Sequence, residues 1–314
     1  MKYGDYSLLE KIRYYTNKYF FSKIYSVFNI ILLNIIFITN PICSNNKSKI
    51  EIHTLLCKRD ISIYLCAIKS FVLFSKLNPE IIIHDDGSLN SYHQDLIQRH
   101  IIGARIISRE SADNLINNKL KKYKSILDSR KNNILLLKLI DINFFSKSDA
   151  QVILLDSDIF FRRPPKEIMD WCKSNSKKIL YTQEPNYWVI SKEGKPFYLR
   201  KEFEWLNVNL PKSFNAGLLC YKSGIIDYEL LEKYCQITKG WENSFWIEQS
   251  FYAIICALNE SEALPTEYLN KHKFKIKNPI SRHHYDSKTR FNYFYFTKDL
   301  LRIYGSLLLK IKYE

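Results

Sequence analysis

The stretch Val152-Ile-Leu-Leu-Asp156-Ser-Asp158-Ile-Phe-Phe161 decides the fold. Its four consecutive apolar residues are typical of a central parallel strand that is covered on both faces. Asp156 follows directly, and ligands in open α/β sheets bind beyond the carboxyl ends of the strands. If the chain stays extended, Asp156 and Asp158 project to the same side, where two carboxylates repel each other unless a cation lies between them. The pattern predicts a site for Mg²⁺ or Mn²⁺; an ordinary solvated acidic turn is the alternative.

Strands and helices alternate on either side of this stretch. The first strand is expected at Ile50–Leu56. Further segments follow in the order helix, strand, helix, strand, helix, helix: Asp60 to about Leu77, Glu80–His84, Gln94–His100, Ala104–Ile107, Ala112–Arg130 and Ile134–Phe145. Such interleaving predicts an α/β fold with right-handed crossovers and a parallel-rich twisted sheet flanked by helices. We expect one domain over residues 49–314.

Residues 1–48 differ from the rest and predict an N-terminal helical extension. The stretch from Ile24 to Asn46 carries no charge. Asn29 and Asn34 interrupt its apolar part, which ends before Pro41. It is preceded by the basic residues Lys2, Lys11, Arg13, Lys18 and Lys23. A helical hairpin packed on the catalytic domain is the favoured interpretation. An interfacial membrane helix and a signal anchor are the alternatives, so peripheral membrane contact stays open.

Composition excludes several classes of protein. With only 8 Gly and no G-x-G-x-x-G or G-x-x-x-x-G-K-[ST] motif, the chain is neither a dinucleotide-binding Rossmann protein nor a P-loop NTPase. The 47 Lys+Arg exceed the 32 Asp+Glu and give a net charge of +15. The excess is spread along the chain without a nucleic-acid module, so no nucleic-acid partner is expected. The 7 Cys form no C-x-x-C pair, which favours reduced thiols and a cytoplasmic, optionally membrane-associated, protein.

Over most of residues 49–314 the sequence resembles the GT-A nucleotide-sugar glycosyltransferases, in particular glycogenin-like and lipopolysaccharide galactosyltransferase-like members. The resemblance implies that Asp156 and Asp158 hold Mn²⁺ or Mg²⁺ against the donor diphosphate, with Ser157 at the substrate. His284, followed by Arg290, resembles the late histidine that completes the metal site in these families. The adjacent His283 is a rival, because the family pattern H-x-x-G-x-x-K is replaced here by Ser287 and Arg290.

Further motifs follow the family order, and each has a plainer structural interpretation. Asp85-Asp86-Gly-Ser resembles the acidic turn that contacts the nucleoside; an ordinary Asp/Gly turn is the alternative. Asn215-Ala-Gly217 resembles the segment that approaches the donor sugar, where glycine permits close backbone approach. Glu248-Gln249 resembles the acidic-Gln pair at a helix start. Two cationic residues are also candidates. Lys138 either faces the diphosphate or extends to the surface. Arg290 is expected at the substrate.

These motifs together imply a metal-dependent glycosyltransferase. It would move a sugar from a nucleotide diphosphate donor, a UDP-sugar in the first instance, to a hydroxyl of a glycan, lipid-linked or protein acceptor. Glu248 would be the base of an inverting reaction or would line the sugar pocket of a retaining one. A haloacid-dehalogenase-type phosphatase, which also places D-x-D after an apolar strand, is the second enzyme class. A basic membrane- or nucleic-acid-binding protein is the non-enzymatic alternative.

Overall fold

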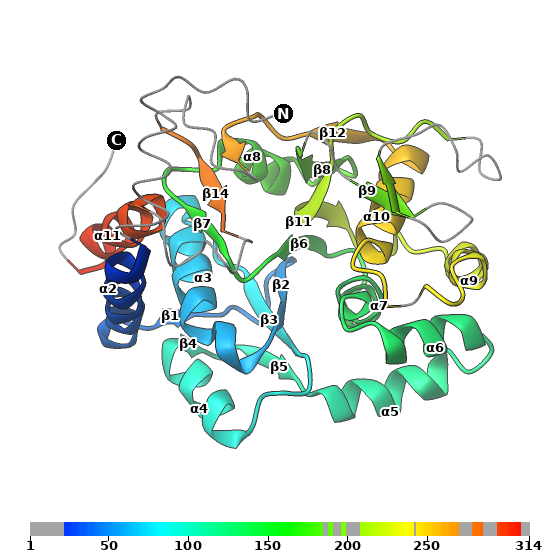
Figure 1. Ribbon diagram of the computed structural model, residues 1–314, viewed down its shortest axis with the longest axis horizontal. Helices are drawn as coiled ribbons and strands as arrows, with labels where there is room; N and C mark the ends of the chain where they lie inside the picture. Colours follow the sequence, from blue (N-terminus) through cyan, green and yellow to red (C-terminus); the bar gives the residue numbers. More distant parts are fainter. Residues whose placement is uncertain are drawn as a thin grey trace.

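The computed structural model describes residues 22–184, 188–190, 196–198, 208–241, 243–269, 278–284 and 294–308. Its centre is a seven-stranded mixed sheet (Figure 1). The strands lie in the order β12 (Ser261–Ala263), β8 (Ile179–Thr182), β11 (Asn215–Lys222), β6 (Gln151–Leu155), β2 (Ile50–Leu56), β3 (Glu80–Asp85) and β5 (Arg105–Ile107). Four of the six neighbouring pairs are parallel, and the pairs that β11 makes with β6 and β8 are antiparallel.

Helices cover both faces of this sheet, and β6 shows why. Ile153 and Leu155 pack into one core cluster, and Val152 and Leu154 into the other, as alternation along a strand requires. The first cluster also takes in α3 (Ile61–Ser75), α8 (Lys166–Ser174) and α11 (Phe294–Leu308). The second takes in α5 (Arg109–Lys119), α6 (Lys124–Asn132), α7 (Leu136–Phe145), α9 (Tyr228–Ile237) and α10 (Ile247–Leu258). The predicted α/β class and the doubly covered central strand are confirmed.

Short strands outside the main sheet complete the fold. The pair that matters for the site is β7 (Ile159–Phe161) with β14 (Ser281–His283), which run antiparallel. The other short elements are β13 (Tyr268–Leu269) beside β14, β1 (Ile42–Cys43) beside β4 (Ile101–Ile102), β9 (Trp188–Ile190) beside β10 (Pro196–Tyr198), η3 (Lys58–Asp60) and α4 (Ser91–His100).

One predicted helix is divided in the structure. The sequence favours helix over residues 112–130, but α5 ends at Lys119 and α6 begins at Lys124. The carboxylate of Glu232 on α9 accepts hydrogen bonds from the backbone amides of Ser125 and Ile126. The first amides of a helix have no hydrogen-bond partner within the helix. The carboxylate of Glu232, which is distant in sequence, therefore stabilises the start of α6. That contact could not be read from the local sequence.

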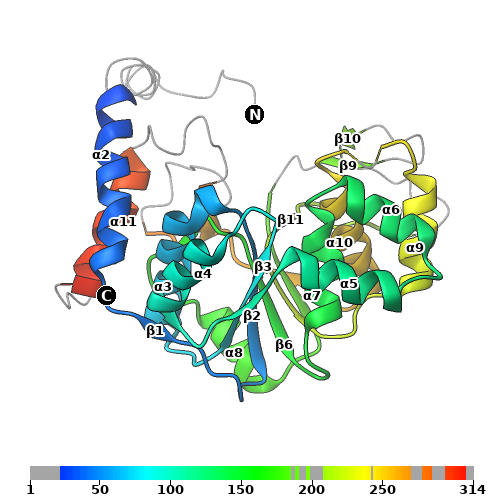
Figure 2. The ribbon, with the colours of Figure 1, turned by 90° about the horizontal axis from the view of Figure 1, so that it is seen from below.

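The described part of residues 1–48 holds two helical segments and the short strand β1. Helix α2 (Ser22–Asn34) continues into η2 (Ile35–Ile38) and lies beside α11 at one end of the molecule (Figure 2). Asn29, which interrupts the apolar stretch, is buried and accepts a 2.7 Å hydrogen bond from the hydroxyl of Thr297. No helix among the described residues is both long and apolar enough to cross a bilayer. Residues 1–21 lie outside the described part, and the domain boundary after residue 48 stays a prediction.

Candidate active site and metal centre

Asp156 and Asp158 lie where the chain turns from β6 into β7. The amide of Asp156 donates to the carbonyl of Gly217 at 2.8 Å, and the amide of Ile159 donates back to the carbonyl of Asp156 at 3.3 Å. The chain therefore turns here and does not stay extended as the sequence argument assumed. The side chain of Asp156 is 27% exposed and that of Asp158 is buried. One acidic group is thus open to a ligand while the other is held in the protein.

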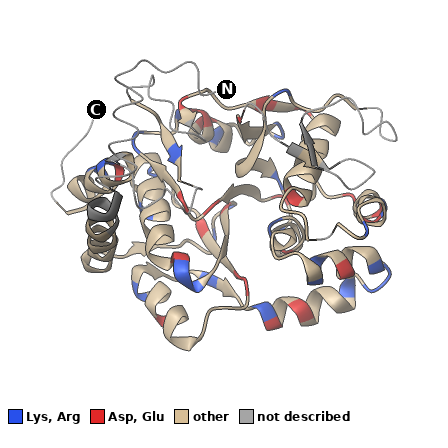
Figure 3. Ribbon diagram, viewed as in Figure 1, with Lys and Arg blue, Asp and Glu red and all other residues tan. Residues whose placement is uncertain are grey.

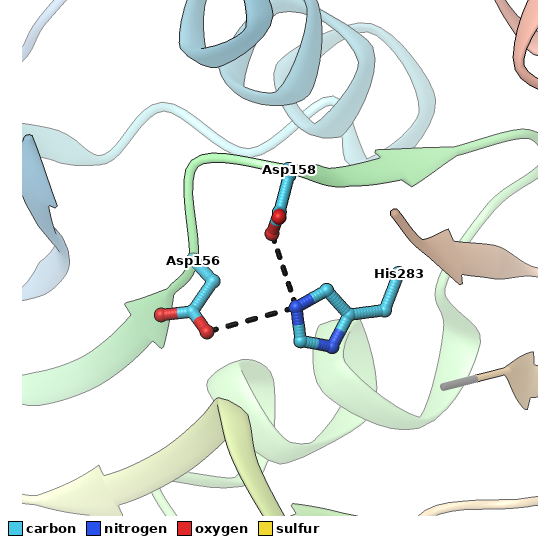
Figure 4. A group of neighbouring side chains, drawn as sticks. All are labelled: Asp156, Asp158 and His283. Atoms are coloured by element: carbon cyan, nitrogen blue, oxygen red, sulfur yellow. Dashed lines mark ion pairs between the residues drawn. The ribbon is translucent and has the colours of Figure 1, made fainter. Parts of the chain in front are cut away.

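The third member of the cluster is His283, which comes from β14 (Figure 4). Antiparallel pairing sets His283 opposite Ile159 and brings its Nε2 to 3.0 Å from Oδ1 of Asp158 and 3.7 Å from Oδ2 of Asp156. Burial lowers the pKa of His283, but the charge and hydrogen bond of Asp158, together with Asp156 and Glu184, raise it by more, so the net pKa lies above its usual value. One donor atom from each of the three residues lies within 4.8 Å of the others.

The structure corrects the choice of His284 as the third candidate ligand. Successive side chains on a strand point to opposite faces, so His284 points away from Asp156. Its Nε2 lies 3.1 Å from Oδ2 of Asp299, and its amide donates to the carbonyl of Asp158. The imidazole beside the acidic pair belongs to the rival, His283.

Gly217 makes the space in which these groups meet. A Cβ at position 217 would lie 2.7 Å from Cε1 of His283, 2.9 Å from Oδ1 of Asn215 and 3.0 Å from Oδ2 of Asp156. No real side chain fits at such distances. Asn215 secures the same turn, since its Oδ1 accepts from the Gly217 amide at 2.8 Å and its Nδ2 donates to Glu184 at 3.0 Å. A glycine at position 217 is therefore required by the packing of the cluster, and its expected approach to the donor sugar stays a prediction.

Lys138 and Glu248 face the cluster from α7 and α10. The ammonium of Lys138 is 2.8 Å from Oδ1 of Asp156 and 3.4 Å from Oε1 of Glu248, so Lys138 points into the site and does not extend to the surface. Burial lowers the pKa of Lys138, but the two carboxylates raise it by more, and the group is charged. Burial raises the pKa of Glu248 to about 7, against the opposing effect of Lys138. A carboxyl group with that pKa can exchange a proton near neutral pH.

All of these groups border a single cavity of about 320 Å³. The sequence-predicted residues that line it are Asp86, Lys138, Asp156, Ser157, Asp158, Asn215, Gly217, Glu248 and Gln249, together with His283. Ala216, the middle residue of the Asn215–Gly217 segment, also lines the cavity. Lining residues that the sequence did not single out are Leu55, Cys57, Arg59, Asp60, Ile134, Leu135, Glu184, Phe245 and Trp246. Cys57, Arg59 and Asp60 follow β2, the parallel neighbour of β6, so the position of a strand end was an available signal for them.

Two predicted substrate residues are placed differently. Asp85 is absent from the cavity lining; its Oδ1 accepts hydrogen bonds from the amides of Gly87 at 2.8 Å and Leu89 at 3.0 Å. The contact role expected for Asp85 is therefore corrected to shaping the turn that presents Asp86. Arg290 lies outside the described residues.

No protein-family model and no curated protein matched the sequence. Several solved structures resemble the fold. Mouse xyloside xylosyltransferase 1 aligns with 79% of this chain and 99% of its own, at 11% identity and a TM-score of 0.49. The mannosyltransferase Ktr4p from S. cerevisiae aligns with 79% of each chain, at 12% identity and a TM-score of 0.47.

The galactosyltransferase LgtC, solved with donor and acceptor sugar analogues, aligns with 82% of this chain and 96% of its own, at 10% identity and a TM-score of 0.48. All three are named as glycosyltransferases, the class that the sequence motifs resemble. Because the identities are low and the TM-scores lie below 0.5, the function of this chain is argued from its own residues.

Proposed function

We propose that the chain is a metal-dependent glycosyltransferase that moves a sugar from a nucleotide diphosphate donor, a UDP-sugar in the first instance, to a hydroxyl group. The observation that carries the proposal is the convergence of Asp156, Asp158 and His283 within 4.8 Å, in the same cavity as Lys138 and Glu248. Two carboxylates and an imidazole suit Mg²⁺ or Mn²⁺, and the nitrogen ligand favours Mn²⁺. The catalytic domain would span residues 49–314.

The residues around the cluster divide the work of binding a donor. Asp156, Asp158 and His283 would hold the ion, which when bound supplies a Lewis acid that neutralises charge on the leaving diphosphate. Lys138, already charged and 2.8 Å from Asp156, adds a fixed cation on the same side of the cavity. Asp86 and Ser157 line the cavity and would contact the nucleotide. Those contacts fix the orientation in which the donor sugar meets Glu248.

Glu248 is the candidate for proton transfer. It is buried in the first turn of α10, and its pKa of about 7 lets it take a proton from an acceptor hydroxyl in an inverting reaction. In a retaining reaction Glu248 would instead line the sugar pocket with Asn215 and Gln249, whose side-chain amides can donate to and accept from sugar hydroxyls.

The acceptor would be a glycan, a lipid-linked sugar or a protein. The exposed face of α2 favours a location of the protein at a membrane surface. This face carries Val27, Ile30 and Ile31, and Ile38 follows in η2; Ile31 is 58% and Ile38 is 74% exposed. Basic residues precede this face in the sequence, and a segment that combines lysines with an apolar helix face suits an anionic lipid surface. On α5 and α6, by contrast, basic and acidic residues are mixed (Figure 3).

The proposal is tested by thermal denaturation in the presence of nucleotide sugars, with and without Mn²⁺. A ligand that binds only the folded state raises Tm, so one nucleotide sugar should raise Tm and should do so only with the ion. Asp158→Asn is the matched variant and should lose the shift. If no nucleotide sugar raises Tm while a phosphate monoester is hydrolysed, the phosphatase alternative replaces the proposal.

A further inference from the structure

Behind the metal cluster, on the far side of β14, lies a second buried cluster that the proposed chemistry does not use. Asp299 of α11 is fully buried. Its Oδ1 lies 2.8 Å from Nη1 of Arg162, and its Oδ2 lies 2.8 Å from Nη1 of Arg282 and 3.1 Å from Nε2 of His284. The carboxylate of Asp299 therefore connects Arg162, the residue after β7, to Arg282 in β14.

Asp299 contacts the two residues that flank His283: Arg282 within β14 and His284 directly after it. Because side chains alternate along a strand, Arg282 and His284 point to one side and His283 to the other. Asp299 thus holds the strand on both sides of the imidazole that faces Asp156 and Asp158. The backbone of this segment is also held by its pairing with β7 from residues 281 to 283, by the two-residue pairing with β13, and by the amide of His284, which donates to the carbonyl of Asp158.

The charges of the second cluster make this attachment strong. Burial raises the pKa of Asp299, but His284, Arg282 and Arg162 lower it by more, so the carboxylate is ionised. His284 adds a contact to the same carboxylate, since its Nε2 lies 3.1 Å from Oδ2 of Asp299. Charge-assisted hydrogen bonds of this kind are shorter and stronger than neutral ones, and removing one member leaves buried charges unpaired.

We propose that Asp299 is a positioning residue for the metal site: from the C-terminal helix it fixes the backbone of β14 so that His283 points at the acidic pair. The proposal rests on the proposed function, since it takes Asp156, Asp158 and His283 as the ligands. It adds a residue that touches neither metal nor substrate. Groups that orient metal ligands typically change metal affinity by about 10- to 100-fold when they are replaced.

The test measures Mn²⁺ binding to the full chain by the loss of the electron paramagnetic resonance signal of free Mn²⁺, a readout independent of activity. Asp299→Asn should weaken Mn²⁺ binding by about tenfold and change the spectrum of the bound ion. Tyr304→Phe is the matched control, because it removes a buried hydroxyl from the same helix, 3.5 Å from Sγ of Cys66, without touching β14. It should lower Tm while leaving Mn²⁺ affinity unchanged.

The outcomes separate this proposal from the metal site itself. If His283→Ala abolishes Mn²⁺ binding while Asp299→Asn, folded by circular dichroism, binds as tightly as the wild type, Asp299 is only structural and the positioning role is overturned. If the wild type itself binds no Mn²⁺, or His283→Ala binds as well as the wild type, the ligand assignment fails. Should Asp299→Asn not fold, His284→Gln decides: weaker Mn²⁺ binding supports the proposal, and unchanged binding overturns it.

Discussion

Gly217 and His283 share one small space, since a Cβ at 217 would lie 2.7 Å from the imidazole Cε1. Gly217→Ala should therefore displace His283 and weaken Mn²⁺ binding by about tenfold or more, as loss of a well-placed ligand does. The measurement is a Mn²⁺ titration with circular dichroism as the check on folding.

The control for this variant is Gly224→Ala. Position 224 has a φ of +88° with nothing within 4 Å of the added Cβ, so the change costs about 1 kcal/mol of backbone strain without reaching the cluster. Equal Mn²⁺ affinity in Gly217→Ala and the wild type would contradict the steric argument.

Asp158→Asn keeps the shape of the side chain and removes a charge. We expect it to abolish Mn²⁺-dependent UDP binding, and EDTA to have the same effect on the wild type, with Mn²⁺ restoring binding better than Ca²⁺, whose longer bonds suit looser sites. Isothermal titration with UDP measures the outcome. Asp170→Asn, at an exposed position on α8, should behave as the wild type, and full UDP binding in EDTA would refute the metal assignment.

Glu248→Gln should lower turnover by about 10²- to 10⁴-fold, the range typical of lost general-base catalysis, while donor affinity changes little. The amide fills the same volume and can still accept a hydrogen bond from Lys138, which lies 3.4 Å from the carboxylate. Turnover and donor affinity, measured separately, distinguish a chemical role from a binding one. A variant with normal turnover would reduce Glu248 to a residue of the helix start.

Lys69 gives a prediction for the pH dependence of stability. Its buried ammonium donates to Oγ1 of Thr39 at 2.8 Å and to the carbonyl of Asn40 at 2.9 Å, and so fastens the end of η2 to α3. Lys69→Met should lower the free energy of unfolding by about 1–3 kcal/mol at pH 7, because it leaves these acceptors unsatisfied.

The sign of the pH effect follows from the same residue. Burial lowers the pKa of Lys69 in the folded protein to about 8, from an ordinary value of 10.5. Between these values the unfolded chain binds more protons, so stability from this group rises with pH and is lost as pH falls through 8. Urea unfolding should show the gap between wild type and Lys69→Met widening from pH 7.5 to 9.5. A gap that narrows would mean that folding raises the pKa of Lys69 above its ordinary value of 10.5, and would contradict the effect of burial.

The exposed face of α2 is tested with vesicles of phosphatidylglycerol and phosphatidylcholine. The double variant Ile30→Ser, Ile31→Ser should reduce the vesicle-bound fraction of the full chain several-fold, because each isoleucine that enters the interface contributes about 1 kcal/mol or more. Leu115→Ser, which removes a comparably exposed apolar side chain from α5, is the control. Equal loss in both variants would show that α2 has no special role.

Local patterns predicted those parts of the molecule that local physics determines. The apolar run at 152–155 forms β6, because burial on both faces favours continuous apolar residues, and the strand predicted at Ile50–Leu56 forms β2. Asp156 lies at the sheet edge because it follows directly after β6. Gly217 was singled out for its approach to the donor sugar, whereas the structure shows it leaving space for His283 and Asp156. The choice between His283 and His284 needed the register of β14 against β7, which no single-sequence pattern contains.

Other site residues could not be placed from the sequence for the same reason. Asp85 and Asp86 are adjacent in sequence, yet one accepts hydrogen bonds from its own turn and the other lines the cavity. Glu184, after β8, lines the cavity because β11 pairs with both β8 and β6 and so places β8 one strand away from β6. Asp299 belongs to a helix whose sequence carries no motif. Each of these placements depends on contacts between segments that are distant in the chain.

The two sides of the metal cluster are made at different times during synthesis. A ribosome that has released β6 and β7 has not yet made β14 or α11, so the nascent chain presents the acidic pair without His283 and without Asp299. If the proposed metal ion binds here, its binding would have to wait for the end of the chain. The bound ion would close a loop that contains β8, β11, α9 and α10, and a constraint on a long loop removes much of the entropy of the unfolded chain. Chelation should accordingly release the carboxyl-terminal segment first, and limited proteolysis should begin there.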